Sequence, residues 1–304
     1  MRGNGSHVAR VLLAVNVRAR SGADARERAE ALLRARGHEI EILESNSAQE
    51  LSDGIGARRG AIDVAVVGGG DGTLISAIEG LRRADVPLLI LPLGTINELS
   101  RTLAIPFAIE EACALLEEGE PHAIDAGCVN GTWFFNEASI GLSTHVAREQ
   151  TGEVKSRWGM LAIPVATLRS IRLLGGMRWY HLDVEDDTGK RRRFRTVQLT
   201  VANSYRFGGV VENPDASIDD GWLDLYSVNL KFWWSVLDVL FAVARKRFPE
   251  SRAVETMRAH GFTVTSRRPH NVFADGEPAM QTPATFTIVP GAIRVFVPRG
   301  SQHT

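Results

Sequence analysis

The chain has 304 residues, a formal net charge of −1, 44% hydrophobic residues and 23% charged residues. These values are ordinary for a globular protein, and the balanced charge gives no reason to expect a nucleic-acid partner or bulk attraction to a membrane. A length of 304 residues favours two domains, because a single hydrophobic core stops growing near about 250–300 residues.

The first residues of the chain, its lack of a long apolar stretch and its two cysteines favour a cytoplasmic protein. Residues Met1 to Arg10 are polar and lack the apolar core of a secretory signal. No stretch reaches the roughly 18 apolar residues of a membrane span. The two cysteines, Cys113 and Cys128, lack metal-ligand spacing and are expected to be thiols of a reducing compartment.

The first 123 residues alternate strand and helix patterns. Strands are predicted over residues 11–15, 39–43, 64–67 and 86–91, and helices over residues 23–36, from residue 48, and over residues 109–118. Alternation of this kind predicts a parallel, doubly wound sheet with helices on both faces. We therefore expect an α/β domain over residues 1–123.

From residue 124 the pattern changes to short strands of alternating polarity. They are predicted over residues 133–135, 180–184, 194–202, 222–228, 262–265 and 286–289. Helical stretches interrupt them near residues 155–174 and 231–248. Such a run predicts a β-rich, antiparallel sandwich or barrel-like domain over residues 124–304.

The segment Val64–Leu74 carries the most informative pattern. A short apolar run ends in three consecutive glycines, which Asp71, Gly72 and Thr73 follow. Glycines let backbone N–H groups approach a polyphosphate closely, in conformations that a side chain would forbid. Asp71 can face a hydrated Mg²⁺, Thr73 can offer a hydroxyl, and helical spacing over Leu74–Leu81 places a helix N-terminus behind the loop. The pattern indicates a phosphate site, although it lacks the Lys-Ser or Lys-Thr pair of a P-loop.

A second glycine turn, Gly94-Thr95, follows another buried strand. Residues Val86–Leu91 are apolar on both faces, as expected of a buried parallel strand, and they lead into the segment Pro92–Arg101. Ligands of open α/β sheets gather outside the carboxyl ends of the strands. The two glycine turns are therefore expected to face one nucleotide.

Gly69–Thr73 and Pro92–Glu98 together resemble the diacylglycerol kinase catalytic family, whose relatives include the sphingosine kinases and the NAD kinases. The second motif is similar to that of the lipid-kinase branch, and NAD kinases lack it. Further segments resemble the family in the same order along the chain, at residues 124–142, 151–159, 219–225, 272–278 and 288–298. The resemblance implies an ATP- and Mg²⁺-dependent kinase of phospholipid metabolism. Its acceptor would be the hydroxyl of a diacylglycerol-like or phosphatidylglycerol-like lipid.

The resemblance also implies the site residues. The nucleotide-binding positions are Ser45, Gly69, Gly70, Asp71, Gly72, Thr73, Thr95, Asn97 and Glu98. Of these, Asp71 and Glu98 would act through metal-bound water. The general base on the acceptor hydroxyl is Asp275 or Glu277, and that choice stays open. The resemblance also implies a structural Mg²⁺ at Ser217, Asp220 and Trp222, through one aspartate and two backbone carbonyls. Such oxygen ligands suit Mg²⁺ or Ca²⁺ rather than zinc.

Local patterns leave plainer interpretations open. Asp275-Gly276 is the strongest short hairpin signal, and Asp219–Gly221 could be only a turn. The apolar segment Leu230–Arg247 could be an interfacial helix, but a helix packed against a sheet is favoured. The basic run Lys190–Arg193 fits anionic headgroups or a charged hairpin tip in water.

Two departures from the family pattern motivate alternative functions. Ile75 stands where the family usually has asparagine, and Glu98 stands where it has aspartate. They leave open a non-catalytic nucleotide- or lipid-binding homologue. A soluble-substrate kinase of the NAD kinase kind is a further alternative, which Pro92–Glu98 disfavours. The expected partners are ATP and a lipid at the inner face of the membrane, with peripheral contact and no nucleic acid; a homodimer is left open.

Overall fold

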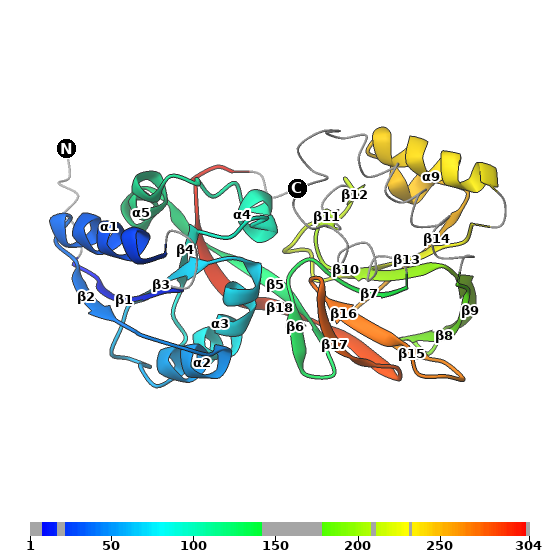
Figure 1. Ribbon diagram of the computed structural model, residues 1–304, viewed down its shortest axis with the longest axis horizontal. Helices are drawn as coiled ribbons and strands as arrows, with labels where there is room; N and C mark the ends of the chain where they lie inside the picture. The colour runs from blue at the N-terminus through cyan, green and yellow to red at the C-terminus, as the bar shows by residue number, and fades with distance from the viewer. Residues whose placement is uncertain (1–7, 17–21, 142–177, 208–210, 231–232, 302–304) are drawn as a thin grey trace. The chain divides into compact units, whose positions relative to one another are not determined.

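The computed structural model describes residues 8–16, 22–141, 178–207, 211–230 and 233–301. The chain divides into two compact units, Met1–Ala126 with Pro290–Thr304, and Gly127–Val289 (Figure 1). Strands β5 (Glu120–Val129) and β18 (Ala284–Val297) each contribute residues to both units. The return of the last residues to the first unit is not visible in the sequence pattern, which assigns all of residues 124–304 to one domain.

The first unit is a parallel sheet that is covered on both faces. Its strands lie in the order β2-β1-β3-β4, and the end of β18 pairs in parallel with β4. Their bounds are β1 (Arg10–Val15), β2 (Glu39–Ile42), β3 (Val64–Gly69) and β4 (Leu88–Pro92). Every residue of β3 and β4 is buried, which explains why their sequences are continuously apolar. The predicted doubly wound α/β domain is confirmed.

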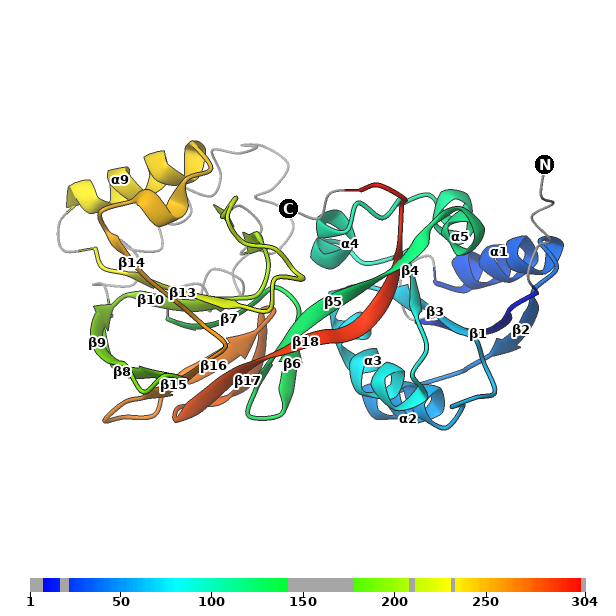
Figure 2. The same ribbon diagram turned by 180° about the vertical axis from the view of Figure 1, so that it is seen from behind.

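Helices cover this sheet in two pairs. They are α1 (Gly22–Ala35), α2 (Ala48–Gly56), α3 (Asp71–Ala84), the short α4 (Glu98–Thr102) and α5 (Ile109–Glu118). Helices α1 and α5 pack together on one face, and α2 and α3 pack together on the other (Figure 1, Figure 2). The predicted helix over residues 109–118 has the same bounds as α5.

Helices α2 and α3 approach each other through a glycine. A Cβ atom at Gly80 would lie 2.3 Å from the carbonyl oxygen of Ser52, and a backbone atom cannot move aside cheaply. We therefore expect Gly80→Ala to lower the free energy of unfolding by about 1–3 kcal/mol in urea denaturation. Gly72→Ala in the same helix is the control, because its added Cβ meets nothing within 4 Å. Equal losses in both variants would contradict this packing.

The second unit is an antiparallel sandwich, as predicted. One sheet has the order β14-β13-β10-β7-β16-β17, and strands β15, β8 and β9 continue the other sheet from β18. A single apolar core that draws residues from both sheets includes Phe134, Phe194, Phe262 and Phe286. The bounds are β6 (Thr132–Phe134), β7 (Glu137–Gly141), β8 (Tyr180–Asp186), β9 (Arg191–Thr196), β10 (Gln198–Ala202), β11 (Arg206–Phe207), β12 (Val211–Glu212), β13 (Leu223–Val228), β14 (Val254–Ala259), β15 (Gly261–Thr265), β16 (Asn271–Ala274) and β17 (Glu277–Gln281).

The strand predicted over residues 194–202 is two strands in different sheets. Strand β9 pairs with β8, whereas β10 lies between β7 and β13. The chain changes sheet at Val197, where the Gln198 N–H donates to the hydroxyl oxygen of Thr196 at 3.1 Å. Phe194 and Leu199 on either side of the step face the same core, so the apolar pattern continues across it and conceals the break.

Helix α9 (Trp233–Ala244) belongs to the second unit. Its Val239 and Val243 pack against an apolar cluster that includes Val197, Tyr226 and Phe248. This contact supports the favoured interpretation of a helix packed on a sheet. In the described part of the chain, no helix is long and apolar enough to cross a membrane. The helical stretch predicted near residues 155–174 lies outside the described residues.

The basic run after Gly189 forms one strand of the β8–β9 hairpin. Arg191 contacts the Glu185 carboxylate at 2.9 Å, and Arg193 contacts that of Asp183 at 2.6 Å. These guanidinium groups are thus already neutralised by acids of the partner strand. The pairing favours the solvated hairpin over a site for anionic headgroups.

Candidate active site

Strand β3 passes into helix α3 through a single residue. The strand ends at Gly69, Gly70 is the extended N-cap (φ −96°, ψ −177°), and the helix begins at Asp71. The Gly70 carbonyl accepts the N–H groups of Thr73 (2.9 Å) and Leu74 (3.2 Å). The first N–H groups of a helix lack intrahelical acceptors, and its N-terminus carries a partial positive charge. The start of this 14-residue helix is therefore suited to a phosphate group.

The glycines of this turn are required by space and not by unusual dihedral angles. None of Gly68, Gly69 and Gly70 has a left-handed φ. A Cβ at Gly69 would lie 2.5 Å from Thr73 Oγ1, and one at Gly68 would lie 2.9 Å from Val15 Cγ2. This corrects the reason that the sequence pattern suggests: close packing, and not a conformation forbidden to side chains, excludes a Cβ here.

The second glycine turn packs against the first, backbone to backbone. A Cβ at Gly94 would lie 2.5 Å from Gly70 Cα. The turn is closed by Asn97, which has a left-handed backbone (φ 49°) and is 2% exposed. Its Oδ1 accepts the Gly94 N–H at 2.9 Å, and its Nδ2 donates to the Gly94 carbonyl at 2.8 Å. Both polar atoms of the Asn97 amide thus hold the turn.

Asp71 ties the two turns together. Its carboxylate accepts the backbone N–H groups of Glu98 (3.1 Å) and Leu99 (3.2 Å) at the start of α4. Each oxygen receives one of these bonds, and a carboxylate oxygen has a second lone pair. The same carboxylate therefore fits the predicted role of accepting from metal-bound water.

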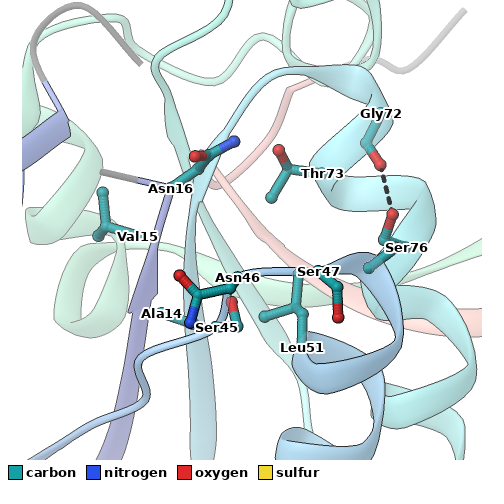
Figure 3. A pocket seen from close by; sticks show the side chains of 11 residues that line it. Ala14, Val15, Asn16, Ser45, Asn46, Ser47, Leu51, Gly72, Thr73 and Ser76 are labelled. Atoms are coloured by element: carbon teal, nitrogen blue, oxygen red, sulfur yellow. Dashed lines mark hydrogen bonds between the residues drawn. The ribbon is translucent and has the colours of Figure 1, made fainter. Parts of the chain in front are cut away.

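A polar cavity of about 190 Å³ lies beside the start of α3 (Figure 3). The end of β1, the segment before α2 and the first turns of α3 line it, with the polar side chains of Asn16, Ser45, Asn46, Ser47, Thr73 and Ser76. In the order β2-β1-β3-β4 the chain winds one way from β1 and the other way from β3, and ligands bind at such a switch point. Ligand pockets usually measure about 300–1,000 Å³, so this cavity would hold part of a nucleotide.

Several lining residues were not predicted from the sequence. Asn16 directly follows β1, so its place at a strand end is a signal that could have found it. Ser47 is the N-cap of α2 and accepts the Glu50 N–H at 3.1 Å. Ser76 hydrogen-bonds the Gly72 carbonyl at 2.8 Å from the second turn of α3. A polar residue on the exposed face of a helix gives no such signal.

The Asp-Gly signal is a two-residue hairpin between β16 and β17. Asp275 (φ 44°) and Gly276 (φ 85°) are both left-handed, as in a type I′ turn. The Asp275 carboxylate accepts three consecutive backbone N–H groups of Phe135–Glu137, at 2.7, 3.0 and 2.8 Å. A carboxylate offers about four lone-pair positions. Most of this one is therefore committed to holding the segment between β6 and β7.

Glu277, the other candidate base, is the first residue of β17 and is exposed. Within the described ranges, no hydrogen bond or ion pair of its carboxylate is present. The two acids of the hairpin therefore differ in their contacts: the Asp275 carboxylate holds the turn to residues 135–137, and that of Glu277 is exposed.

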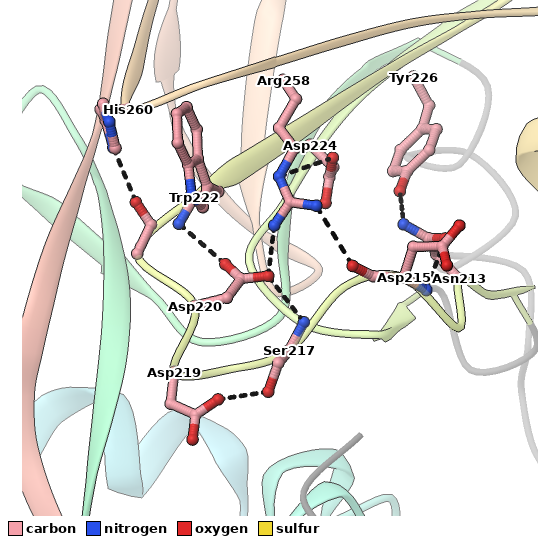
Figure 4. Close-up of polar contacts among 11 residues, drawn as sticks. Asn213, Asp215, Ser217, Asp219, Asp220, Trp222, Asp224, Tyr226, Arg258 and His260 are labelled. Atoms are coloured by element: carbon pink, nitrogen blue, oxygen red, sulfur yellow. Dashed lines mark hydrogen bonds and ion pairs between the residues drawn. The ribbon is translucent and has the colours of Figure 1, made fainter.

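The loop for which a structural metal is implied has its carboxylate paired with an arginine (Figure 4). Asp220 Oδ2 accepts from Arg258 Nη2 (2.6 Å) and the Ser217 N–H (3.0 Å), and Oδ1 accepts the Trp222 N–H (2.9 Å). Burial raises the pKa of the neighbouring Asp224 to about 6, and Arg258 opposes the shift. Over the described part of the chain, no cluster of three or more His, Cys, Asp or Glu residues suits a metal. The bonds from Arg258, Ser217 and Trp222 leave about one lone-pair position of the Asp220 carboxylate for a metal ion.

The predicted site residues fall into two groups. All the nucleotide-binding positions belong to the first unit, where Ser45, Gly72 and Thr73 line the cavity and Thr95 is exposed in the second turn. The candidate bases and the implied metal ligands belong to the second unit. The family-like segment 151–159 lies outside the described residues.

Two protein-family models match the chain. The diacylglycerol kinase catalytic domain matches residues 10–129. The YegS C-terminal NAD kinase beta sandwich-like domain matches residues 136–297. The first match ends and the second begins near the division between the two units.

Individual proteins resemble the chain over most of its length. A diacylglycerol kinase from Staphylococcus saprophyticus is 29% identical over 245 residues, which cover 79% of each chain. A Pseudomonas aeruginosa protein named as a YegS-like lipid kinase is 31% identical over 254 residues, 78% of this chain and 77% of its own. A crystal structure from Bacillus anthracis, described as a diacylglycerol kinase, has a TM-score of 0.79 at 25% identity and covers 98% of both chains.

The α/β unit with its paired glycine turns and the β-sandwich unit together define a two-domain kinase. The chain belongs to the diacylglycerol kinase family.

Proposed function

We propose that the protein transfers the γ-phosphoryl group of ATP to a hydroxyl group of a diacylglycerol-like or phosphatidylglycerol-like lipid. The pair of packed glycine turns, which brings a helix N-terminus to the edge of a polar cavity, carries the proposal. The names of the relatives, diacylglycerol kinase and lipid kinase, support a lipid acceptor.

In this proposal the phosphates of ATP bind at the start of α3, at Gly69–Thr73. The hydroxyls of Ser45 and Thr73 face the same cavity and would donate to the nucleotide. Asn97 would act by holding the second turn, since both polar atoms of its amide are bonded to Gly94. Glu98 stands where the family has aspartate. This difference does not affect the hydrogen bond to the Asp71 carboxylate, because the backbone N–H of residue 98 donates it.

The chemistry is a direct displacement without a phosphoenzyme. Mg²⁺ bound with ATP would neutralise the β- and γ-phosphates, and Asp71 and Glu98 would hold it through water. Glu277 takes the proton of the lipid hydroxyl. As it does so, the hydroxyl oxygen of the lipid bonds to the γ-phosphorus, and the bond between the γ-phosphorus and the ADP oxygen breaks. A lipid alcohol is a very weak acid, so the base acts only as charge leaves the attacking oxygen. Asp275 positions the hairpin that carries Glu277.

Incubation with ATP labelled in the γ-phosphate, Mg²⁺ and mixed micelles tests this function. The micelles would contain diacylglycerol, phosphatidylglycerol, a sphingoid base or an isoprenoid alcohol in separate reactions. We expect label in one lipid product and none when EDTA is present. Measurable ATP binding without label in any lipid would contradict the proposal and favour a nucleotide-binding role.

A further inference from the structure

We propose that Arg258 is the internal cation that holds the loop Asn213–Trp222 to the antiparallel sheet, in place of a structural divalent metal. The loop connects β12 to β13, and Arg258 projects onto it from β14. The proposal concerns how the second unit is stabilised, and it does not depend on the reaction that the protein catalyses.

The guanidinium of Arg258 contacts the loop at two separate points (Figure 4). Its Nη2 donates to Asp220 Oδ2 at 2.6 Å, and its Nη1 donates to the backbone carbonyl of Asp215 at 3.2 Å. Arg258 is the cross-strand partner of Asp224, and its Nε lies 3.9 Å from Asp224 Oδ1. One side chain thus connects the loop with the first residues of β13.

These contacts are of the kinds that a metal would use. The implied Mg²⁺ would take one aspartate oxygen and two backbone carbonyl oxygens, and the guanidinium takes the Asp220 carboxylate and one backbone carbonyl. Arginine carries a permanent charge and five donors, so it can satisfy both kinds of oxygen at once.

The carboxylate of Asp220 has little room for a second cation. Its oxygens accept the backbone N–H groups of Ser217 and Trp222 in addition to Arg258, which fills three of about four lone-pair positions. A divalent ion at the remaining position would stand beside the positive guanidinium. Repulsion between the two cations disfavours that arrangement.

Other contacts anchor both ends of the loop to the sheet without a metal. At one end Asn213 Nδ2 donates to the hydroxyl of Tyr226 on β13 at 2.7 Å. At the other end Trp222 stacks on His260, with ring centroids 3.9 Å apart and an angle of 24° between the planes. His260 Nδ1 also lies 2.9 Å from the Gly221 carbonyl oxygen. Between these two anchored ends, the positive charge that binds the loop is that of Arg258.

The thermal midpoint of the full chain, measured without ATP or lipid, tests the proposal. We expect the wild-type midpoint to be the same in EDTA and in MgCl₂. Arg258→Met is expected to lower it by roughly 4 °C or more. Arg192→Met is the matched control, because Arg192 is also 38% exposed and bonds one carboxylate (Glu255, 2.9 Å) and one carbonyl (Thr256, 3.3 Å). The thermal midpoint of Arg192→Met should fall by less than half as much as that of Arg258→Met.

Two results would overturn the proposal. One is a wild-type midpoint that falls in EDTA and recovers with Mg²⁺, with this response absent in Asp220→Asn. The other is a loss in Arg258→Met no larger than the loss in Arg192→Met. If Arg258→Met does not fold, the wild-type comparison between EDTA and Mg²⁺ still decides.

Discussion

Replacement of Glu277 by glutamine is expected to slow phosphoryl transfer to the lipid by about 10²–10⁴-fold, which is the usual contribution of a general base. Glutamine has nearly the same shape and cannot take the proton of the attacking hydroxyl. Because Glu277 is exposed at the start of β17, the free energy of unfolding and the affinity for ATP should not change. Steady-state kinetics at saturating ATP would show the loss in kcat. Asp187→Asn, at another exposed acid of the same unit, should keep full activity.

Asp275→Asn separates the two acids of the hairpin. An amide nitrogen cannot accept the N–H groups of Phe135–Glu137, so at least one of them would lose its acceptor. An unsatisfied buried donor costs about 1–3 kcal/mol, and the variant should therefore unfold at lower urea concentration as well as lose activity. A stable, inactive Asp275→Asn together with an active Glu277→Gln would reverse the assignment of the base.

Gly94→Ala is expected to weaken ATP binding without altering a catalytic group. The added Cβ would lie 2.5 Å from Gly70 Cα and 2.5 Å from Asn97 Oδ1, so the two glycine turns would have to separate. Separation would displace the start of α3, whose N–H groups are proposed to bind phosphate. We expect the affinity for ATP, measured by calorimetry, to fall at least tenfold, equivalent to about 1.4 kcal/mol.

Gly54→Ala distinguishes this effect from general overpacking. The three atoms nearest to its added Cβ would all belong to the Leu43 side chain, the closest at 2.7 Å, and Gly54 does not line the cavity. This variant should lose stability at most and keep its affinity for ATP. Unchanged ATP affinity in Gly94→Ala would show that the packing of the two turns does not shape the nucleotide site.

Much of the first unit could be predicted because its strands are buried on both faces and its helices are amphipathic. The apolar run Val64–Val67 and the spacing over residues 109–118 each specify one element by local sequence alone. The second unit was harder. Strand β14 (Val254–Ala259) was missed because polar and charged residues interrupt its apolar positions on both faces, so its sequence shows no clean alternation. The return of β18 to the first unit depends on pairing between distant residues, which no local pattern records.

In the candidate site, too, features built from consecutive residues were predicted from the sequence, and contacts between residues far apart in the chain were not. The glycine motifs identified Asp71 and the start of α3, because the phosphate site is built from consecutive residues. The partners of the acids could not be predicted from spacing. Arg258 lies 38 residues from Asp220, and the Asp275 carboxylate reaches backbone groups up to 140 residues away. These contacts arise only when strands from separate parts of the chain form one sheet.

The ratio of ADP formed to lipid phosphate formed tests the proposed function most directly. Purified protein would be given ATP, Mg²⁺ and the lipid acceptor, with both products quantified from the same reaction over time. Direct transfer to the lipid predicts a ratio of one at every time point and no ADP when the lipid is omitted. ADP that appears without lipid, or lipid that stays unphosphorylated while ATP binds, would contradict a lipid kinase.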